Sequence, residues 1–136
     1  MKTEKPGVTT PTYPVFHVCD GIFIKQNSSR VKYLYADILY VEASRSYSDI
    51  HFKGGSKITI ALPLLVVEQK FPHDQFMRVH RRYILNLNCI CAFCGNSARI
   101  GKELFMISAP YRRELYALFD FLEEVRVDVE ERGDEE

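Results

Sequence analysis

The chain has 136 residues, 46% of them apolar and 26% charged, which predicts a single globular domain with a substantial core. No stretch approaches the roughly 20 apolar residues of a membrane span, and the polar N-terminus carries no signal peptide, so the sequence argues against a membrane-spanning or secreted protein and predicts a cytoplasmic one. The net charge of zero hides an asymmetry, because residues 21–113 carry 14 Lys and Arg against 6 Asp and Glu (net +8), whereas residues 114–136 carry 2 against 10 (net −8).

The first half of the chain is predicted to form β-strands joined by short turns. Residues 1–13 are rich in proline and polar residues and are expected to be a flexible leader. Apolar segments bounded by turn residues predict strands at residues 15–18, 22–25, 31–35, 38–43, 47–52 and 57–60. The first two should form a hairpin about Asp20 and Gly21. The fourth is so apolar that it is expected to be buried on both faces, with Leu39 in the core.

Helical spacing occurs first in residues 62–71. Pro63 suits a first helical turn, and one face is marked by Leu62, Leu65, Val66 and Gln69. Short strands are then predicted at residues 76–79, 83–85, 90–93, 98–100 and 104–107.

A second helix is predicted over residues 111–125. Its apolar stripe consists of Tyr111, Leu115, Leu118, Leu122 and Val125. The stripe either packs on the sheet or pairs with a second copy in a homodimer. Residues 126–136 are an acidic tail with too few apolar residues to fold alone.

Four cysteines raise the question of a metal site. Cys89, Cys91 and Cys94 are close in sequence, but zinc needs a fourth ligand and this spacing is not a paired C-x-x-C motif. Cys89 and Cys91 share one face of a predicted strand, where a free cysteine behaves as a small apolar residue. We therefore predict reduced structural thiols, Cys19 included, and no bound metal or other cofactor. The alternative is a redox or zinc-binding module centred on Cys89, Cys91 and Cys94.

The residues that could support catalysis are scattered. No nucleotide-binding or nucleophile motif occurs. Glu42 and Asp49 form a carboxylate pair whose separation the spacing does not fix, and Asp49 with His51 could act as a general base, but no nucleophile accompanies them. The sequence therefore predicts that the protein is not an enzyme and has no small-molecule substrate.

Basic residues cluster instead at predicted strand ends. Arg45 lies between two strands, Arg81 and Arg82 lie in a turn, and Arg112 and Arg113 follow the last strand. The planar guanidinium group can bridge guanine edges or grip phosphate oxygens. Three such clusters at one edge of a β-scaffold would form a surface for DNA. The alternative is a solvated basic surface without a ligand.

Three sequence blocks, at residues 37–51, 76–86 and 107–113, resemble the LytTR family of DNA-binding domains, the output modules of many bacterial transcriptional regulators. The resemblance runs from about residue 22 to residue 113 and depends on the order and spacing of the blocks. It implies a mainly β fold of antiparallel sheets with one short central helix and a C-terminal helix, in a domain over residues 14–125. It also implies a double-stranded DNA partner, whose two successive major grooves and intervening minor groove are read by loops.

Carried over position by position, the resemblance implies DNA contacts from three loops. The residues are Arg45, Tyr47, Ser48, His80, Arg81, Arg82, Arg112 and Arg113. Arg81 would lie at the minor groove, which attracts arginine where it is narrow. Pro110 departs from the family, which often has a basic residue there, so Arg112 and Arg113 are the candidates for the third loop.

Several of these residues have another interpretation. His80 could be a structural histidine that orients the Arg81 turn, and Tyr47 could belong half to the core. Arg78 could lie over an aromatic ring as a cation–π pair. Glu42 could be a structural carboxylate paired with an arginine. Without specific DNA reading, the same fold would serve as a protein-interaction or sensory module.

Truncation after Val125 is expected to tighten non-specific DNA binding, because a tethered acidic segment competes with DNA at a raised effective concentration. The effect should be largest at low salt, where the Debye length is about 30 Å at 0.01 M. A salt titration on a random duplex compares the full-length and truncated proteins. Superimposable curves would mean that the tail stays clear of the DNA-binding face, and weaker binding after truncation would point to a C-terminal segment that supports a DNA-bound dimer.

Overall fold

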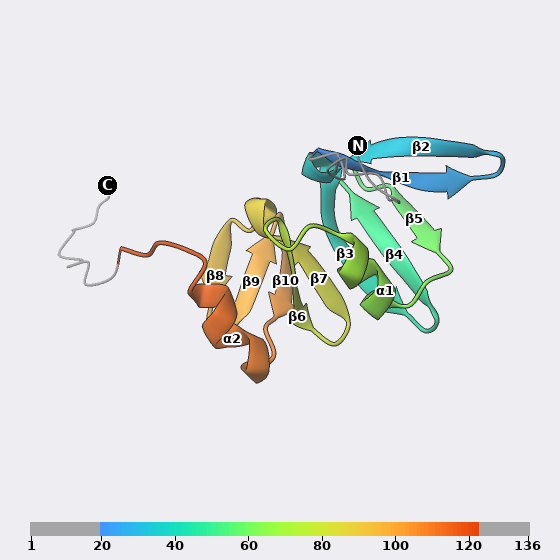
Figure 1. The fold of residues 1–136 in the computed structure, drawn as a ribbon. Helices are drawn as coiled ribbons and strands as arrows, with labels where there is room; N and C mark the ends of the chain where they lie inside the picture. Colours follow the sequence, from blue (N-terminus) through green and yellow to red (C-terminus); the bar gives the residue numbers. More distant parts are fainter. Residues whose placement is uncertain (1–19, 123–136) are drawn as a thin grey trace, which may run out of the picture.

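A computed structural model of the protein describes residues 20–122, which form ten strands and two α-helices (Figure 1). The strands are β1 (Gly21–Gln26), β2 (Ser29–Leu34), β3 (Ile38–Ser44), β4 (Tyr47–Phe52), β5 (Lys57–Ile60), β6 (Phe76–His80), β7 (Tyr83–Asn86), β8 (Ala92–Cys94), β9 (Ser97–Ile100) and β10 (Glu103–Met106). The helices are α1 (Leu64–Lys70) and α2 (Ala109–Tyr116). All strand pairs are antiparallel, which confirms the predicted fold class.

A five-stranded sheet in the order β5-β4-β3-β7-β6 forms the centre of the molecule. Its middle strand, β3, is buried on both faces as predicted, since Val41 belongs to one core and Tyr40 to the other. Leu39 is the exception. It lies where the β3–β4 register shifts between Ile38 and Tyr40, and it is only partly buried. At such a bulge the alternation of faces is interrupted, and Leu39 and Tyr40 both pack with the second core.

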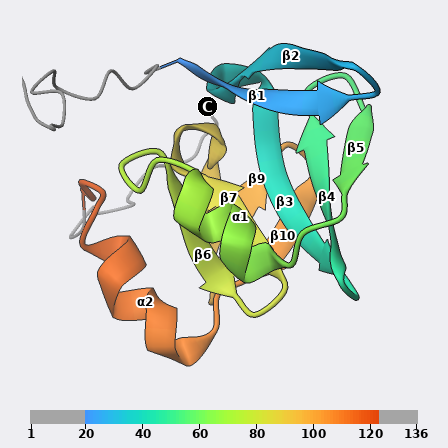
Figure 2. The same cartoon turned by 45° about the vertical axis from the view of Figure 1, so that its right-hand side comes forward.

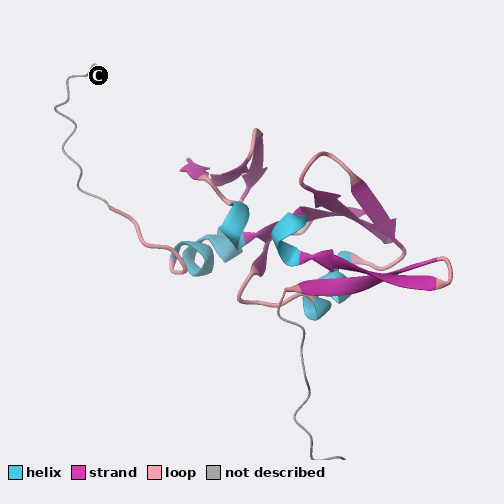
Figure 3. Ribbon diagram, turned by 90° about the horizontal axis from the view of Figure 1, so that it is seen from above, coloured by secondary structure: helices cyan, strands magenta, loops and turns pink. Residues whose placement is uncertain are grey.

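Two separate cores cover the two faces of this sheet. The first lies under α1 and the β1–β2 hairpin and includes Val41, Leu64, Val67 and Phe71. Figure 2 shows α1 in front of the sheet. The second core lies between the sheet, the three-stranded sheet β10-β9-β8 and α2. Seen from above, the three-stranded sheet and the β1–β2 hairpin occupy opposite ends of the molecule (Figure 3).

The boundaries and buried face of α1 differ from the prediction. Pro63 is the N-cap residue rather than part of the first turn. The helix buries Leu64 and Val67, whereas Leu65, assigned to the buried face, is 57% exposed. Because the helix has only two turns, it packs on the sheet through a single i, i+3 pair, Leu64 and Val67. Phe71, the residue after the helix, packs in the same core.

The second helix is shorter than predicted, because α2 ends at Tyr116. Leu115 is buried, but Leu118 is exposed and Leu122 is 92% exposed. Beyond the helix, the chain turns so that the ring of Phe119 packs 5.4 Å from that of Phe93 on β8. The apolar spacing therefore did not mark one continuous helix. Val125 lies outside the described residues.

The predicted hairpin of residues 15–18 with residues 22–25 is only partly described. Residues 15–18 lie outside the described residues, as do the predicted leader and acidic tail. Within the described range, β1 pairs with β2, in a register that joins Gly21 to Leu34 and Gln26 to Ser29. No helix within residues 20–122 is long and apolar enough to cross a membrane.

The predicted strand face shared by two cysteines is not formed. Cys89 ends a short 3₁₀ turn, η2 (Leu87–Cys89), and Cys91 precedes β8. Cys89 is partly buried, and burial raises the pKa of its thiol. Cys91 and Cys94 are exposed, and a hydrogen bond with Arg99 lowers the pKa of the Cys91 thiol. These two cysteines are surface residues rather than core residues.

Candidate nucleic-acid interface

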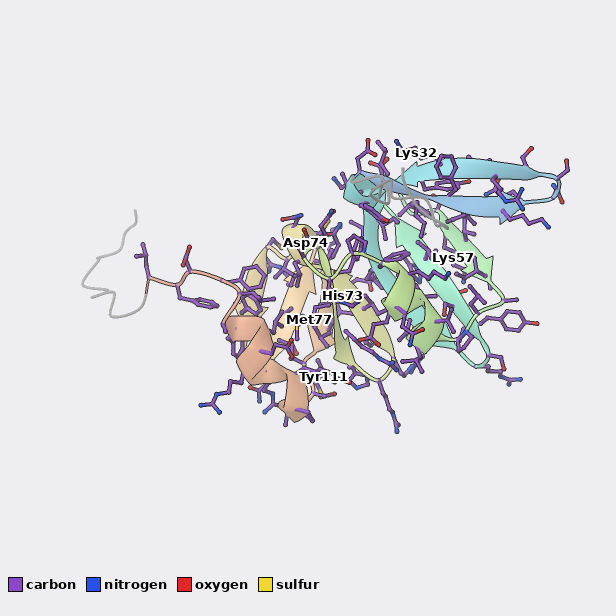
Figure 4. All side chains as sticks on the ribbon, viewed as in Figure 1. Lys32, Lys57, His73, Asp74, Met77 and Tyr111 are labelled. Atoms are coloured by element: carbon purple, nitrogen blue, oxygen red, sulfur yellow. The ribbon has the colours of Figure 1, made fainter. Side chains whose placement is uncertain are left out.

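The three basic segments of the sequence lie at one edge of the central sheet. The β3–β4 turn and the β6–β7 turn are neighbours, since Ala43 N donates a hydrogen bond to Arg82 O at 2.9 Å. The β10–α2 junction joins them through Ser108 N, which donates to Val79 O at 2.9 Å. All three connections lie along the lower edge in Figure 1. Figure 4 shows Tyr111, near the start of α2, beside the β6–β7 hairpin.

Arg45 occupies a strained position in the β3–β4 turn. Its φ of 59° lies in the left-handed region, which non-glycine residues adopt at a cost of about 1–3 kcal/mol and often at functional sites. The turn is tight, with Ser44 facing Tyr47 in the register of the two strands. Arg45 is exposed and Tyr47 is 50% exposed, so both side chains can reach a ligand at this edge.

Ser48 is not available to a ligand, contrary to the expectation from the family pattern. Its side chain is buried, and its hydroxyl donates a hydrogen bond to Leu62 O at 2.7 Å. This contact ties β4 to the segment between β5 and α1. Ser48 therefore supports the loop from behind.

The β6–β7 turn exposes both Arg81 and Arg82. Arg82 Nη2 lies 3.3 Å from Glu42 Oε2, and its guanidinium carbon lies 5.9 Å from the centroid of the Tyr83 ring. A cation–π contact, the alternative interpretation given for Arg78, is thus made by Arg82. His80 Nδ1 accepts a hydrogen bond from Arg82 N at 3.1 Å. This contact favours the interpretation of His80 as a residue that orients the turn.

The third segment divides its two arginines between different roles. Arg112 is partly buried, and its Nε donates to Ile107 O at 2.9 Å. This bond ties the first turn of α2 to the end of β10. Arg113 is exposed. Pro110 lies in the first turn of α2, where proline fits because that turn leaves backbone N–H groups without helical partners.

Behind the turns lies a cluster of charged residues that the sequence did not place. The β3–β4 register sets Glu42 directly opposite Asp49, and Glu42 Oε1 lies 3.2 Å from His51 Nε2. Glu42 also pairs with Arg82, as the alternative interpretation expected, and Asp49 lies 3.6 Å from Lys57 Nζ. The ligand atoms of these two carboxylates and His51 lie within 4.8 Å of one another. Because each carboxylate already has a cationic partner, the cluster is suited to fixing the strands rather than to holding a metal ion.

A hollow lies between the β3–β4 turn and the β6–β7 turn. It is lined by Glu42, Ala43, Ser44, Arg45, Asp49 and Arg82. Arg45 and Arg82, from different loops, therefore border the same depression. The two arginines share this hollow with the carboxylates of Glu42 and Asp49.

Comparison with known proteins identifies the family. The family model for the LytTr DNA-binding domain matches residues 28–120. The chain is 40% identical over 58 residues to the CO-responsive transcriptional regulator RcoM of Rhodospirillum rubrum, a match that covers 43% of this chain and 24% of that protein. The chain therefore matches only about a quarter of the length of this relative.

A solved structure has the same fold. It is the LytTr DNA-binding domain of a putative methyl-accepting/DNA response regulator from Bacillus cereus, with a TM-score of 0.60 and 21% identity, covering 75% of this chain and 98% of that chain. At this identity the likeness demonstrates the fold alone. Since the family model covers more than half of the sequence, the chain belongs to the LytTR family of DNA-binding domains.

Proposed function

We propose that this protein binds double-stranded DNA in a sequence-specific manner, as a bacterial transcriptional regulator that reads DNA through loops at strand ends. The observation that carries the proposal is the meeting at one edge of the sheet of two basic turns and the basic helix α2, each with an exposed arginine. These arginines are Arg45, Arg81 and Arg113. The charge of residues 21–113, a net +8, supports attraction to phosphate.

Each loop has a distinct role in this proposal. Arg81, at the centre of the edge, enters the minor groove. Arg45 with Tyr47 on one side, and Arg113 on the other, reach the two flanking major grooves. Arg82 contacts phosphate through its exposed guanidinium group, and the ion pair with Glu42 competes with this contact. His80 and Arg112 support the loops through backbone contacts, and Ser48 is left out of the interface because it is buried.

We assign DNA binding to one domain over residues 14–125, in a bacterial cytoplasmic protein. A homodimer fits a repeated DNA site, because two copies bind two half-sites. No catalytic role is assigned to the cluster of Glu42, Asp49 and His51, since its carboxylates are paired with cations.

Selection from a pool of random duplexes tests this function. The expected result is enrichment of a repeated sequence that the protein binds more tightly than a shuffled duplex of equal length. Affinity for either duplex should fall steeply with salt, because phosphate contacts release counterions. A pool that stays random after repeated rounds, with salt-independent binding, would contradict the proposal.

A protein-interaction module is the second candidate function. The observation that favours it is the outer face of β10, an edge strand of the three-stranded sheet on which Leu104 and Met106 are exposed. Exposed apolar side chains on a sheet edge are suited to a protein partner. Salt separates the two functions, since an apolar contact does not weaken steeply as salt is added.

Replacement of Glu42 by Gln is expected to tighten binding to a random duplex by about two- to fivefold at low salt. The substitution removes a negative charge from the basic edge and releases Arg82, whose Nη2 lies 3.3 Å from Glu42 Oε2. Titration of labelled duplex measures the change. The control is Asp37→Asn, which removes an exposed carboxylate before the opposite end of β3. An equal gain in both variants would mean that total charge, rather than release of Arg82, controls the affinity.

A further inference from the structure

We infer that Arg78 is a positioning residue of the DNA interface, which fixes the backbone of the β6–β7 turn so that Arg81 is presented to DNA. Arg78 itself makes no contact with DNA in this inference. The inference rests on the proposed function, because it concerns the same edge of the molecule. It assigns a role to an arginine that lies within the basic segment but points back into the protein.

Every nitrogen of the Arg78 guanidinium group has a partner inside the protein. Nε donates to His80 O at 3.3 Å, and Nη2 donates to Arg81 O at 2.6 Å. Nη1 lies 3.4 Å from Glu68 Oε1. The side chain is only 19% exposed. Of the five N–H donors of the guanidinium group, three are used in these contacts within the protein.

The turn needs these contacts because the β-ladder is irregular there. The register between β6 and β7 shifts between Arg78 and His80. The Arg78 side chain donates to the carbonyl groups that lie two and three residues further along the chain, those of His80 and Arg81. His80 Nδ1 in turn accepts from Arg82 N. Side chains of β6 thus hold both the carbonyl groups and an N–H group of the turn that carries Arg81.

Glu68 connects this arrangement to the first core. It lies on α1, whose Leu64 and Val67 are buried against the central sheet. The Glu68 carboxylate therefore offers Arg78 a partner on a rigid element. Because this carboxylate neutralises the charge of Arg78, the Arg78 side chain contributes by fixing the shape of the turn and not by adding positive charge to the interface. The short helix becomes the support of the loop that is proposed to enter the minor groove.

A double-mutant cycle on the duplex obtained by selection tests the inference. Arg78→Gln is expected to weaken binding by about five- to tenfold in the native background and by less than about twofold when Arg81 is already Ala. In the second background it should also leave the salt dependence of binding unchanged, because Arg78 neutralises no phosphate. Equal losses in the two backgrounds would overturn the inference, since they would mean that Arg78 acts independently of Arg81.

Two further variants separate geometry from charge and protect the test against misfolding. Arg78→Lys keeps the charge but lacks the planar fork, so it should weaken binding nearly as much as Arg78→Gln. Glu68→Gln should weaken binding less than Arg78→Gln does. Its effect should also become smaller when Arg81 is already Ala. Full affinity in Arg78→Lys would overturn the inference. If Arg81→Ala alone leaves the affinity for DNA unchanged, both the inference and the proposed role of this turn fail. If Arg81→Ala weakens binding but Arg78→Gln does not, only the inference is overturned.

Discussion

Arg81→Ala is expected to weaken binding to the selected duplex by about 1–3 kcal/mol, or about 5- to 150-fold in Kd. The loss is large because Arg81 is exposed at the centre of the basic edge, on a turn whose backbone is held by Arg78 and His80. The free energy of unfolding should change by no more than about 0.5 kcal/mol, as is usual for a surface side chain. Titration of labelled duplex, with a thermal melt of each protein, measures both quantities.

The matched control is Arg30→Ala, which removes the same side chain and the same charge from β2. Arg30 is exposed on the β1–β2 hairpin, away from the lower edge of the molecule in Figure 1. Its replacement should change the affinity by less than about twofold, because it removes only long-range attraction. Equal losses at Arg30 and Arg81 would mean that binding follows total charge and that the β6–β7 turn has no special role.

Leu85→Ala is expected to lower the free energy of unfolding by about 2–5 kcal/mol. Leu85 is fully buried on β7, where it faces Tyr40 of β3 and Met77 of β6 in the strand register. Truncation leaves a cavity in the second core, between the two sheets and α2. Denaturant unfolding followed by circular dichroism measures the loss.

Leu39→Ala provides a comparison with the same side chain. Because Leu39 lies at the β3 bulge and is only partly buried, its truncation should cost about 1 kcal/mol. The sequence alone places Leu39 in the core, since it cannot reveal where the register shifts. A larger loss for Leu39→Ala than for Leu85→Ala would contradict the assignment of the second core.

The strands were predictable because their signals are local. Alternating apolar residues mark β4 and β5 themselves. The turn between these two strands is marked by Gly54 and Gly55, both of which have positive φ. The helices were harder, because their buried faces depend on the surface that each one meets. Leu65 and Val67 are both apolar, but only Val67 faces the sheet. Beyond the end of α2, Phe119 packs against Phe93, a contact that spacing cannot reveal.

In the candidate site, too, the sequence shows which residue types are present but not which partners they contact. The positions of Arg45 and Arg81 in turns between strands were readable from the chain order, whereas Arg113, expected just after the last strand, lies in the last turn of α2. The partners of the other residues come from distant segments. The Ser48 hydroxyl is buried against the carbonyl of Leu62, and the Arg78 guanidinium group is paired with Glu68 on α1. Contacts of this kind depend on tertiary packing, which leaves no pattern in a local window of sequence.

The most direct test of the account is to map the surface that DNA covers. The measurement is the change in backbone amide NMR signals when the selected duplex is added to the full-length protein. The account predicts changes concentrated in the β3–β4 turn, the β6–β7 turn and the start of α2, with Arg45, Arg81 and Arg113 among the residues affected. It would be contradicted by changes centred on the β1–β2 hairpin or on the outer face of β8, β9 and β10, with the three turns unaffected.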